Sequence, residues 1–200
     1  MAIDKSWDAR LAYSSIYPLR NTWIKPNHIT SIRLLFGIIA CIAFASGDAF
    51  NANLGAICFV ISNFLDHADG ELARMTGKMS KSGHYFDLIC DALVNILLFI
   101  GIGIGLMHGI LGYVSITIGC IASISVAAIF YMRNEIEKRV GKTNAKQPQA
   151  GGFEAEDVLY LIPVITIADG LMPFLLLAGI GTPLFALWVL NKYLTVLDQK

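Results

Sequence analysis

Two apolar runs joined by a short polar linker decide the fold of this chain. They read LGAICFVISNFLDHADGELAR (residues 54–74) and GHYFDLICDALVNILLFIGIGIGLM (residues 83–107). A helix needs about 20 apolar residues to cross a bilayer core of about 30 Å, and each run has that length. The linker, MTGKMSKS (residues 75–82), is short enough to make the two helices antiparallel neighbours. We therefore expect a transmembrane helical hairpin in the middle of the sequence.

The composition agrees with a protein that lies largely in a bilayer. Hydrophobic residues make up 56% of the 200 residues and charged residues only 15%, whereas soluble domains have roughly 25% charged residues. The mean hydropathy is +0.62. Disorder is excluded by the abundance of large apolar residues, and nucleic-acid binding is not expected at a net charge of +0. The four cysteines lie in apolar stretches without a CxxC pair, so we expect buried thiols rather than disulfides or zinc ligands.

Four further stretches complete a predicted all-α membrane fold with six transmembrane helices. The six spans are expected near residues 29–45, 54–74, 83–107, 111–132, 158–177 and 182–197, with Pro163 and Pro173 as bends in the fifth. The loops near 46–53, 108–112 and 179–182 carry no Lys or Arg, and all 15 basic residues fall on the other side. By the positive-inside rule both termini are cytoplasmic, which requires an even number of spans.

The first 25 residues differ from the rest. Their alternation of apolar and charged residues predicts an amphipathic juxtamembrane helix on the membrane surface (residues 1–25), followed by the six-helix domain (residues 26–200). The charged opening MAIDKSWDAR does not have the pattern of a signal peptide. The polar segment 142–152 is expected to be a mobile cytoplasmic loop.

Four aspartates in or beside apolar sequence mark the expected functional site. Asp66 and Asp69 are spaced i, i+3 on one helix face, and Asp87 and Asp91 are spaced i, i+4 on the next helix. Carboxylates at membrane depth are costly and therefore indicate function. In an antiparallel hairpin both pairs lie near the same cytoplasmic end, where their mutual repulsion calls for cations. Oxygen-only ligand sets suit hard divalent ions such as Mg²⁺, Mn²⁺ or Ca²⁺.

Residues beside the aspartates suit a phosphate-bearing ligand. Gly70, Ala73 and Gly83 are small enough to let a ligand or another helix approach the backbone. Arg74 can bind phosphate oxygens bidentately. His67 is rotated about 100° from Asp66 on the same helix and is expected to be an interfacial residue rather than a metal ligand.

The window from Asp66 to Asp91, DHADGELARMTGKMSKSGHYFDLICD, resembles the signature of the CDP-alcohol phosphotransferase family. That signature is Asp, two residues, Asp-Gly, two residues, Ala-Arg, eight residues, Gly, three residues, Asp, three residues, Asp, and every fixed position is met. The resemblance implies transfer of a substituted phosphate group from a CDP-linked donor to an alcohol, with release of CMP. It also implies that Asp66, Asp69 and Asp87 hold Mg²⁺ or Mn²⁺, with two ions expected. Asp91 would take the proton from the acceptor hydroxyl and could also touch one ion.

The resemblance further implies where the substrates bind. The residues expected to contact the CDP donor are Gly70, Ala73, Arg74 and Gly83, with Asn27, Thr30 and Ser80 as weaker assignments. The expected donor is CDP-diacylglycerol, and the acceptor a small polar alcohol or alcohol phosphate. The other branch of the family, which passes CDP-choline or CDP-ethanolamine headgroups to diacylglycerol, is the alternative.

Acceptor recognition is less constrained by the sequence. Arg133, Lys138 and Arg139 could bind an acceptor phosphate, or could be a basic flank of the fourth span. Family members that use inositol phosphates often have Arg directly after the last Asp, and Ala92 at that position weakens this choice. Acidic residues before the fifth span could bind a headgroup or lie in solvent; these are Glu154, Glu156 and Asp157.

Two functions of other classes are alternatives to an enzyme. A cation or solute transporter also carries intramembrane carboxylates, and a non-catalytic metal-binding scaffold would keep the ligands. The one-sided position of the aspartates and the intact Asp91 argue against both. The resemblance implies a homodimer in a bacterial inner membrane, with the active site facing the cytoplasm. Gly101 and Gly105 offer a small-residue packing face, within the chain or between copies.

Overall fold

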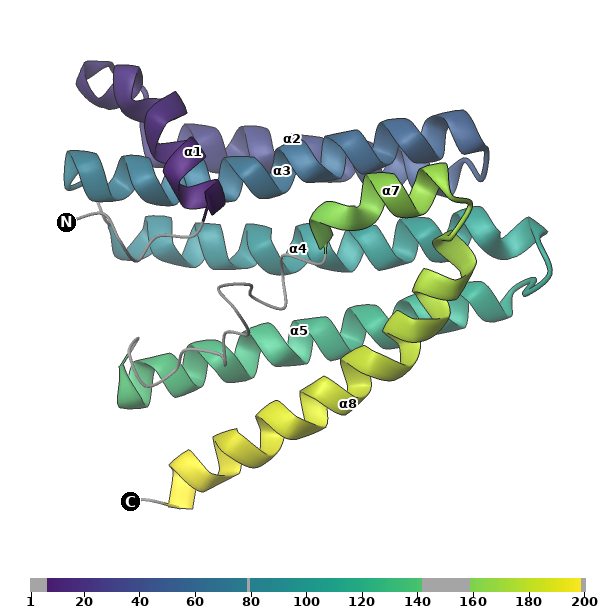
Figure 1. The fold of residues 1–200 in the computed structure, drawn as a ribbon. Helices are drawn as coiled ribbons and strands as arrows, with labels where there is room; N and C mark the ends of the chain where they lie inside the picture. The colour runs from purple at the N-terminus through teal and green to yellow at the C-terminus, as the bar shows by residue number, and fades with distance from the viewer. Residues whose placement is uncertain (1–6, 79, 142–158, 199–200) are drawn as a thin grey trace.

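The computed structural model describes residues 7–78, 80–141 and 159–198. The described residues are helical and contain no strand, so the predicted all-α fold is confirmed. The elements in order are α1 (Trp7–Ile16), the 3-10 helix η1 (Tyr17–Asn21), α2 (Pro26–Ala45), α3 (Ala49–Thr76), α4 (Lys81–Gly105), the 3-10 helix η2 (Leu106–His108), α5 (Val114–Val140), α7 (Ile162–Ile167) and α8 (Leu171–Asp198). The long helices α2, α3, α4 and α5 run roughly side by side, while α8 crosses obliquely beside α5 (Figure 1).

Local signals set the ends of the central hairpin. Asp48 caps the start of α3 by accepting the backbone N–H of Asn51, and hydrogen bonds from Asn51 and Ser46 lower the pKa of this exposed carboxyl. Gly77 ends α3 in the left-handed conformation, with φ of 65°. Ser80 then caps α4 by accepting the backbone N–H of Gly83. The two helices of the predicted hairpin therefore begin and end within a few residues of the expected positions.

Five of the described helices are long and apolar enough to cross a membrane. They are Pro26–Ala45, Ala49–Thr76, Lys81–His108, Val114–Val140 and Leu171–Leu197. The first three agree with the predicted spans and are each extended by a few residues, whereas the fourth begins three residues later than predicted and continues eight residues further, to Val140. The prediction of six full spans differs from the structure in the last part of the chain.

The predicted fifth span, 158–177, is not one helix in the structure. The short helix α7 ends at Ile167, the chain turns at Asp169 with a positive φ of 53°, and α8 begins at Leu171. The turn expected near residues 179–182 is instead continuous helix within α8, and Pro183 also lies inside it. Thr182 donates its hydroxyl to the carbonyl of Ala178, so the helical ladder is supported locally before the proline. The Asp-Gly pair made the turn, whereas the Gly-Thr-Pro run did not.

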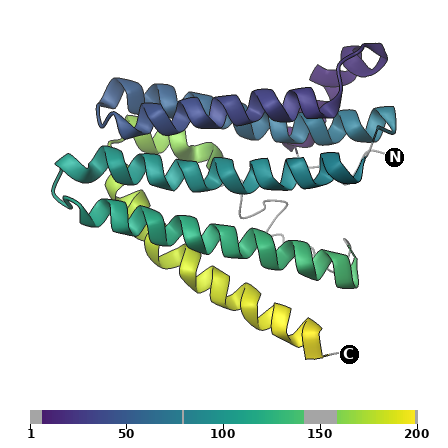
Figure 2. The same ribbon diagram turned by 180° about the vertical axis from the view of Figure 1, so that it is seen from behind.

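The N-terminal helix α1 lies across one end of α3 in both views of the ribbon (Figure 1, Figure 2). Its buried side chains, Ala12 and Ile16, pack against Ala68 and Leu72 of α3. Leu11 is exposed. The helix therefore docks on the protein through small and β-branched residues and leaves Leu11 facing outward.

Close helix packing in the bundle uses glycines of α4. A Cβ atom added at Gly101 would lie 2.7 Å from the carbonyl oxygen of Cys41 on α2, and Gly105 approaches the backbone of Phe44 on the same helix. The small-residue face predicted at Gly101 and Gly105 therefore packs within the chain, against α2. All four cysteines are free thiols.

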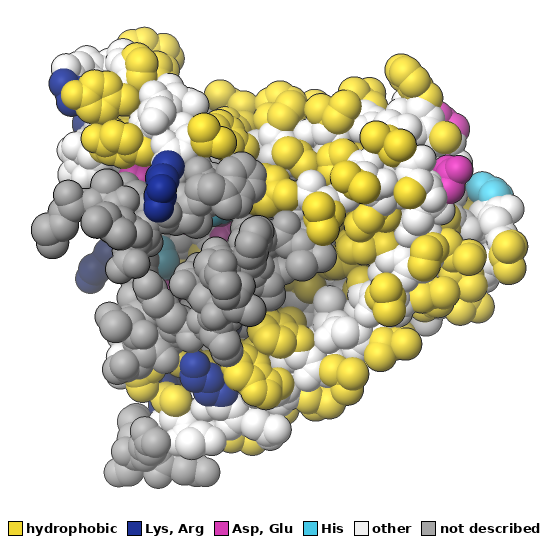
Figure 3. Space-filling view, in the orientation of Figure 1, with side chains coloured by type: hydrophobic (Ala, Val, Ile, Leu, Met, Phe, Trp, Pro, Cys, Tyr) yellow, Lys and Arg dark blue, Asp and Glu magenta, His cyan; other side chains and the backbone are white. Residues whose placement is uncertain are grey.

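The two ends of the bundle differ in charge. On the face shown in Figure 3, Lys and Arg side chains gather at one end and hydrophobic side chains cover the middle. The start of α2, the C-terminal end of α3 and the start of α4 lie at the basic end (Figure 1). The predicted loop 142–152 and the acidic residues Glu154, Glu156 and Asp157 lie outside the described residues.

Candidate active site

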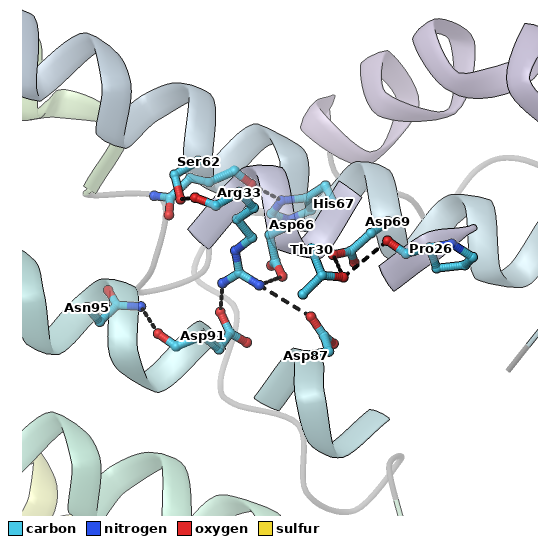
Figure 4. A network of polar contacts seen from close by, with 11 residues as sticks. Pro26, Thr30, Arg33, Ser62, Asp66, His67, Asp69, Asp87, Asp91 and Asn95 are labelled. Carbon is cyan, nitrogen blue, oxygen red and sulfur yellow. Dashed lines mark hydrogen bonds and ion pairs between the residues drawn. The ribbon is translucent and has the colours of Figure 1, made fainter. Parts of the chain in front are cut away.

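Three of the four predicted metal ligands converge at the basic end of the bundle. Asp66 and Asp69 of α3 and Asp87 of α4 each offer a carboxylate oxygen, and these three oxygens lie within 4.8 Å of one another. Figure 4 shows the side chains pointing from the two helices toward a shared centre. The i, i+3 spacing on α3 and the packing of α2 against both α3 and α4 bring these side chains together; α3 and α4, which the sequence predicts to be packing neighbours, touch each other little.

Thr30 of α2 orients the most buried member of the cluster. Its hydroxyl donates a 2.6 Å hydrogen bond to Oδ2 of Asp69, a residue that is only 3% exposed. The sequence predicts Thr30, as one of the weaker assignments, to contact the CDP donor. In the structure it lies against Asp69 and also lines the adjoining cavity. A hydrogen bond to a buried carboxylate fixes which oxygen faces a ligand.

Arg33, one turn after Thr30 on α2, is the main residue that sequence reasoning missed. It was counted only among the basic residues of the cytoplasmic side, but it is buried, at 1% exposure. Its Nη1 lies 2.6 Å from Oδ1 of Asp66 and 3.3 Å from Oδ1 of Asp87, and its Nη2 donates to Oδ1 of Asp91. The signal that could have found it is a lone arginine at a helical spacing from Thr30 inside an apolar run.

Asp91 stands one turn beyond Asp87 on α4. Arg33 joins its carboxylate to those of Asp66 and Asp87, and the side chain of Asn95 donates to its backbone carbonyl (Figure 4). Its carboxylate is not among the three whose oxygens lie within 4.8 Å of one another, although it shares a guanidinium with two of them.

The donor set fits a hard divalent cation. Three carboxylates meet without any His or Cys among them, which is the ligand chemistry of Mg²⁺ or Mn²⁺. In the contacts of the described residues, one guanidinium pairs with three carboxylates, so negative charge is in excess in this group. His67 does not join the set, because its Nδ1 lies 3.2 Å from the carbonyl of Asn63 one turn back on α3.

A cavity of about 400 Å³ opens beside the cluster. Its lining comes from the start of α2, the end of α3, the start of α4 and the end of α5. The lining residues are Pro26, Asn27, Thr30, Asp69, Gly70, Ala73, Arg74, Lys78, Ser80, Gly83, His84, Asp87 and Glu137. All seven residues predicted to contact the CDP donor are among them. His84 and Glu137 were not predicted for this role.

Arg74 is held at the mouth of this cavity by a buried acid. Its Nη2 lies 2.8 Å from Oε1 of Glu71, and the Arg74 side chain is 59% exposed while that of Glu71 is nearly fully buried. A buried carboxylate in this position orients a guanidinium that otherwise has many rotamers. Glu71 occupies a variable position of the motif, so the sequence alone did not single it out.

The two glycines of the site play different steric roles. A Cβ atom at Gly70 would meet only the Arg74 guanidinium, at 3.6 Å or more, and would otherwise point into the cavity. A Cβ atom at Gly83 would lie 2.9 Å from Ser80 Oγ and 3.0 Å from Asn27 Oδ1. Gly70 therefore leaves room for a ligand, and Gly83 leaves room for the polar side chains of the cavity wall.

A second cavity of about 200 Å³ shares His84, Asp87 and Glu137 with the first and reaches Asp91. It is lined by His84, Asp87, Leu88, Asp91, Phe130, Arg133, Asn134 and Glu137. Of the predicted acceptor-side cations, Arg133 lines this cavity. Lys138 instead pairs with Glu135 at 2.7 Å and lies over the ring of Tyr85, and Arg139 is not among the lining residues.

An apolar cavity of about 230 Å³ adjoins the second cavity. The two share Phe130 and Arg133. Its remaining lining comes mainly from apolar residues of α4, α5 and α8, including Phe99, Ile129 and Phe185. A polar compartment next to Asp91 therefore adjoins an apolar one.

Comparison with known families matches the sequence profile described as CDP-alcohol phosphatidyltransferase to residues 23–188. The match contains the whole aspartate window, both helices of the hairpin and the cavity-lining part of α2.

Individual relatives are similar over shorter stretches. Archaetidylinositol phosphate synthase of Pyrococcus horikoshii is 37% identical over 87 residues, 44% of this chain and 45% of the relative. Ceramide phosphoethanolamine synthase of Drosophila melanogaster is 34% identical over 90 residues, 42% of this chain and 23% of the relative. CDP-diacylglycerol–glycerol-3-phosphate 3-phosphatidyltransferase of Rickettsia felis is 32% identical over 69 residues, 34% of this chain and 38% of the relative. The matches thus span less than half the length of these relatives.

A solved structure has the same fold over nearly the whole chain. Mycobacterium tuberculosis phosphatidylinositol phosphate synthase, crystallised with CDP-DAG bound, aligns with a TM-score of 0.61 over 94% of this chain and 92% of that chain. The sequence identity is 18%, so the likeness concerns the arrangement of the helices.

Proposed function

The chain belongs to the CDP-alcohol phosphatidyltransferase family, and we propose that it transfers a substituted phosphate group from a CDP-linked donor to an alcohol, releasing CMP. One observation carries the proposal. Two of the three converging carboxylates, those of Asp69 and Asp87, line a cavity that is also lined by all seven residues that the motif assigns to the donor, and Asp91 lines a second cavity that shares Asp87 with the first.

The cavity beside Gly70 is proposed to take the cytidine diphosphate. Arg74 and Lys78 bring positive charge to its lining, and Asn27 and Ser80 bring hydrogen-bonding groups. A guanidinium suits phosphate oxygens because its planar fork can donate two parallel hydrogen bonds. The missing side chain of Gly70 allows the ligand to approach the α3 backbone.

Asp66, Asp69 and Asp87 are proposed to hold Mg²⁺ or Mn²⁺, with two ions expected. Bound divalent ions supply charge neutralisation and alignment for phosphoryl transfer. The protein's own contribution is to hold these carboxylates within 4.8 Å of one another against their repulsion, which Thr30 and Arg33 help to offset.

Asp91 is proposed as the general base. It would accept the proton of the acceptor hydroxyl while the hydroxyl oxygen forms its bond to the β-phosphorus of the donor. The phosphoanhydride bond to the α-phosphate breaks, and CMP leaves with the bridging oxygen. A base must lie within hydrogen-bond reach of the proton it removes, and Asp91 lines the second cavity, which shares Asp87 with the donor cavity.

The acceptor is proposed to be a small polar alcohol or alcohol phosphate that enters the second cavity. Arg133 provides a cation there for a phosphate, and Asn134 and Glu137 provide partners for hydroxyls. Lys138 and Arg139 stay in the proposal only as charges near the cavity mouth, because neither lines it.

CDP-diacylglycerol is the proposed donor, in a bacterial inner membrane with the site and both termini on the cytoplasmic side. Two observations support this choice. The site lies at the end of the bundle where basic side chains gather, as the positive-inside rule requires of a cytoplasmic end (Figure 3). The solved structure of similar fold was crystallised with CDP-DAG. A homodimer, as the family resemblance implies, belongs to the same proposal.

A lipid alcohol acceptor, with a CDP-amino-alcohol donor, is the second candidate. The apolar cavity that shares Phe130 and Arg133 with the Asp91 cavity favours it, because an acyl chain could lie there with its hydroxyl end at Asp91. Ceramide phosphoethanolamine synthase, named among the relatives, supports keeping this branch open.

The test is CMP release by the purified protein in detergent or vesicles with Mg²⁺ or Mn²⁺. CDP-diacylglycerol would be offered with glycerol 3-phosphate, inositol phosphate, inositol, serine and amino alcohols, and CDP-ethanolamine with diacylglycerol. Release that depends on a soluble acceptor supports the first candidate, and release with a lipid acceptor supports the second. Protein that binds no CDP compound and releases no CMP would contradict both.

A further inference from the structure

Arg33 joins the site from a helix that carries none of the four aspartates. Its guanidinium contacts Asp66 of α3 and Asp87 of α4 through Nη1 and donates to Asp91 of α4 through Nη2. One side chain therefore ties three helices together at the point where the carboxylates meet (Figure 4).

The backbone of Arg33 is held as firmly as its side chain. Ser62 of α3 donates its hydroxyl to the carbonyl of Arg33 at 3.0 Å, in a fully buried contact. One turn earlier on α2, Thr30 holds Asp69. The i, i+3 pair of Thr30 and Arg33 thus supplies one polar partner for every aspartate of the cluster.

Stability alone does not explain a guanidinium here. Replacing buried ion pairs by apolar residues of similar volume is often neutral or stabilising, because desolvation costs offset the attraction. Arg33 also has a buried Nε without a hydrogen-bond partner among the described atoms, which adds to that cost. What a guanidinium offers, and an apolar side chain or an ammonium does not, is two Nη groups in a fixed plane.

We propose that Arg33 is a positioning residue for Asp91, the base of the proposed reaction, on which this inference rests. Nη1 is anchored on Asp66 and Asp87, and the rigid plane of the guanidinium then sets where Nη2 holds Oδ1 of Asp91. The orientation of the base is thereby tied to the carboxylates proposed to bind the metal. Without Arg33, the Asp91 carboxylate would be repelled by Asp87 one turn away and would lose its orientation.

The experiment compares Arg33→Gln and Arg33→Lys with wild type and with Arg20→Gln, an exposed arginine outside the site. We expect Arg33→Gln to lower kcat about 100-fold with the KM of the CDP donor changed less than about threefold. Arg33→Lys should recover only part of this, because one ammonium cannot reach both sets of carboxylates. Arg20→Gln should behave as wild type.

Two further measurements separate positioning from a general loss of structure. In the Asp91→Asn background, Arg33→Gln should lower the residual turnover less than about fivefold, because a residue that acts through Asp91 has nothing left to orient. Metal-free Arg33→Gln should still bind Mn²⁺ saturably in calorimetry, no more weakly than wild type, because a competing cation has been removed.

Each contrary result has a distinct meaning. Losses that multiply in the double variant, near-normal kcat in Arg33→Gln, or loss of its Mn²⁺ binding would each overturn the positioning role. If Arg33→Gln does not fold, full turnover in Arg33→Lys would overturn it equally. Wild-type protein that releases no CMP with any acceptor would overturn the proposed function, and this role of Arg33 with it.

Discussion

Carboxylates lie at both ends of this helical bundle, and the two sets are satisfied in different ways. At one end Asp48 accepts hydrogen bonds from Ser46 and from the backbone and side chain of Asn51, all within three residues of it. At the other end the aspartates of α3 and α4 depend on partners far away in the sequence. Thr30 is 39 residues from Asp69, and Arg33 is 58 residues from Asp91.

The difference distinguishes an acid that caps a helix from the acids proposed to act in the site. A carboxylate whose oxygens accept hydrogen bonds from local donors completes a helix and is stabilised in its charged form without a cation. Carboxylates that face one another, with a single guanidinium among them, retain excess negative charge that suits a bound cation. We therefore expect mutations at the two ends to have opposite patterns of effect on activity and on stability.

The largest effect is expected at Asp91. Asp91→Asn should lower kcat about 1,000-fold, because the amide cannot accept the hydroxyl proton, while the donor still binds. The measurement is CMP release together with binding of the CDP donor in the same preparation. Near-normal turnover in this variant would show that another group is the base.

Asp69→Asn tests whether the aspartates at the site end of the bundle serve metal binding rather than stability. It should lose Mn²⁺ binding and donor binding, with activity reduced at least about 100-fold. In excess EDTA, however, its thermal unfolding temperature should equal or exceed that of wild type, because one of several repelling charges is gone. A lower unfolding temperature in EDTA would mean that Asp69 serves the fold, and full wild-type activity in EDTA would remove the metal from the mechanism.

Gly70→Ala is expected to have an intermediate effect that is confined to binding. The added methyl group meets only Arg74, at 3.6 Å or more, so the unfolding temperature should not change, but donor binding should weaken about tenfold. Gly83→Ala is the matched comparison. Its methyl group would crowd Ser80 and Asn27, so stability and donor binding should both fall. Wild-type donor affinity in Gly70→Ala would indicate that the ligand does not approach this part of α3.

The smallest effect on activity is expected at Asp48. Asp48→Ala should leave CMP release within about twofold of wild type and lower the unfolding temperature slightly, because α3 loses its cap. The pKa of Asp48 is lowered in the folded protein, so its stabilising contribution is present at neutral pH and is lost as the pH falls below its ordinary value of about 4. Strongly impaired turnover in Asp48→Ala would break the distinction between the two ends.

The motif residues could be expected to gather at one place because their signal is local. The aspartates, Gly70, Ala73, Arg74 and Gly83 lie within one hairpin, and helical spacing already places them on facing surfaces. Arg33 and Glu71 were missed for different reasons. Arg33 belongs to another helix, so its approach depends on how α2 packs, and Glu71 is an acid whose burial beside Arg74 no spacing rule reveals.

The last part of the chain shows the opposite case. Gly179, Thr182 and Pro183 look like a turn in sequence, but they lie within α8, where Gly179 packs against Ile118 of α5. Asp169 and Gly170 form the turn that the structure shows. They lie inside a run of mostly apolar residues that the sequence predicts to be one span. In a membrane helix glycine and proline are tolerated when neighbouring helices and side chains satisfy the backbone, so the usual turn signals lose their weight.

By itself, the sequence determined that this is a helical membrane protein with four aspartates gathered at one end of a hairpin. Apolar runs of bilayer length leave no other fold, and spacing along two adjacent helices decides which side chains meet. Tertiary structure decided the rest: that α7 and α8 meet at Asp169, that Gly101 packs on α2, and that Arg33 lies among the carboxylates. Those features depend on contacts between segments far apart in the chain, and no local pattern encodes the angle at which two helices pack.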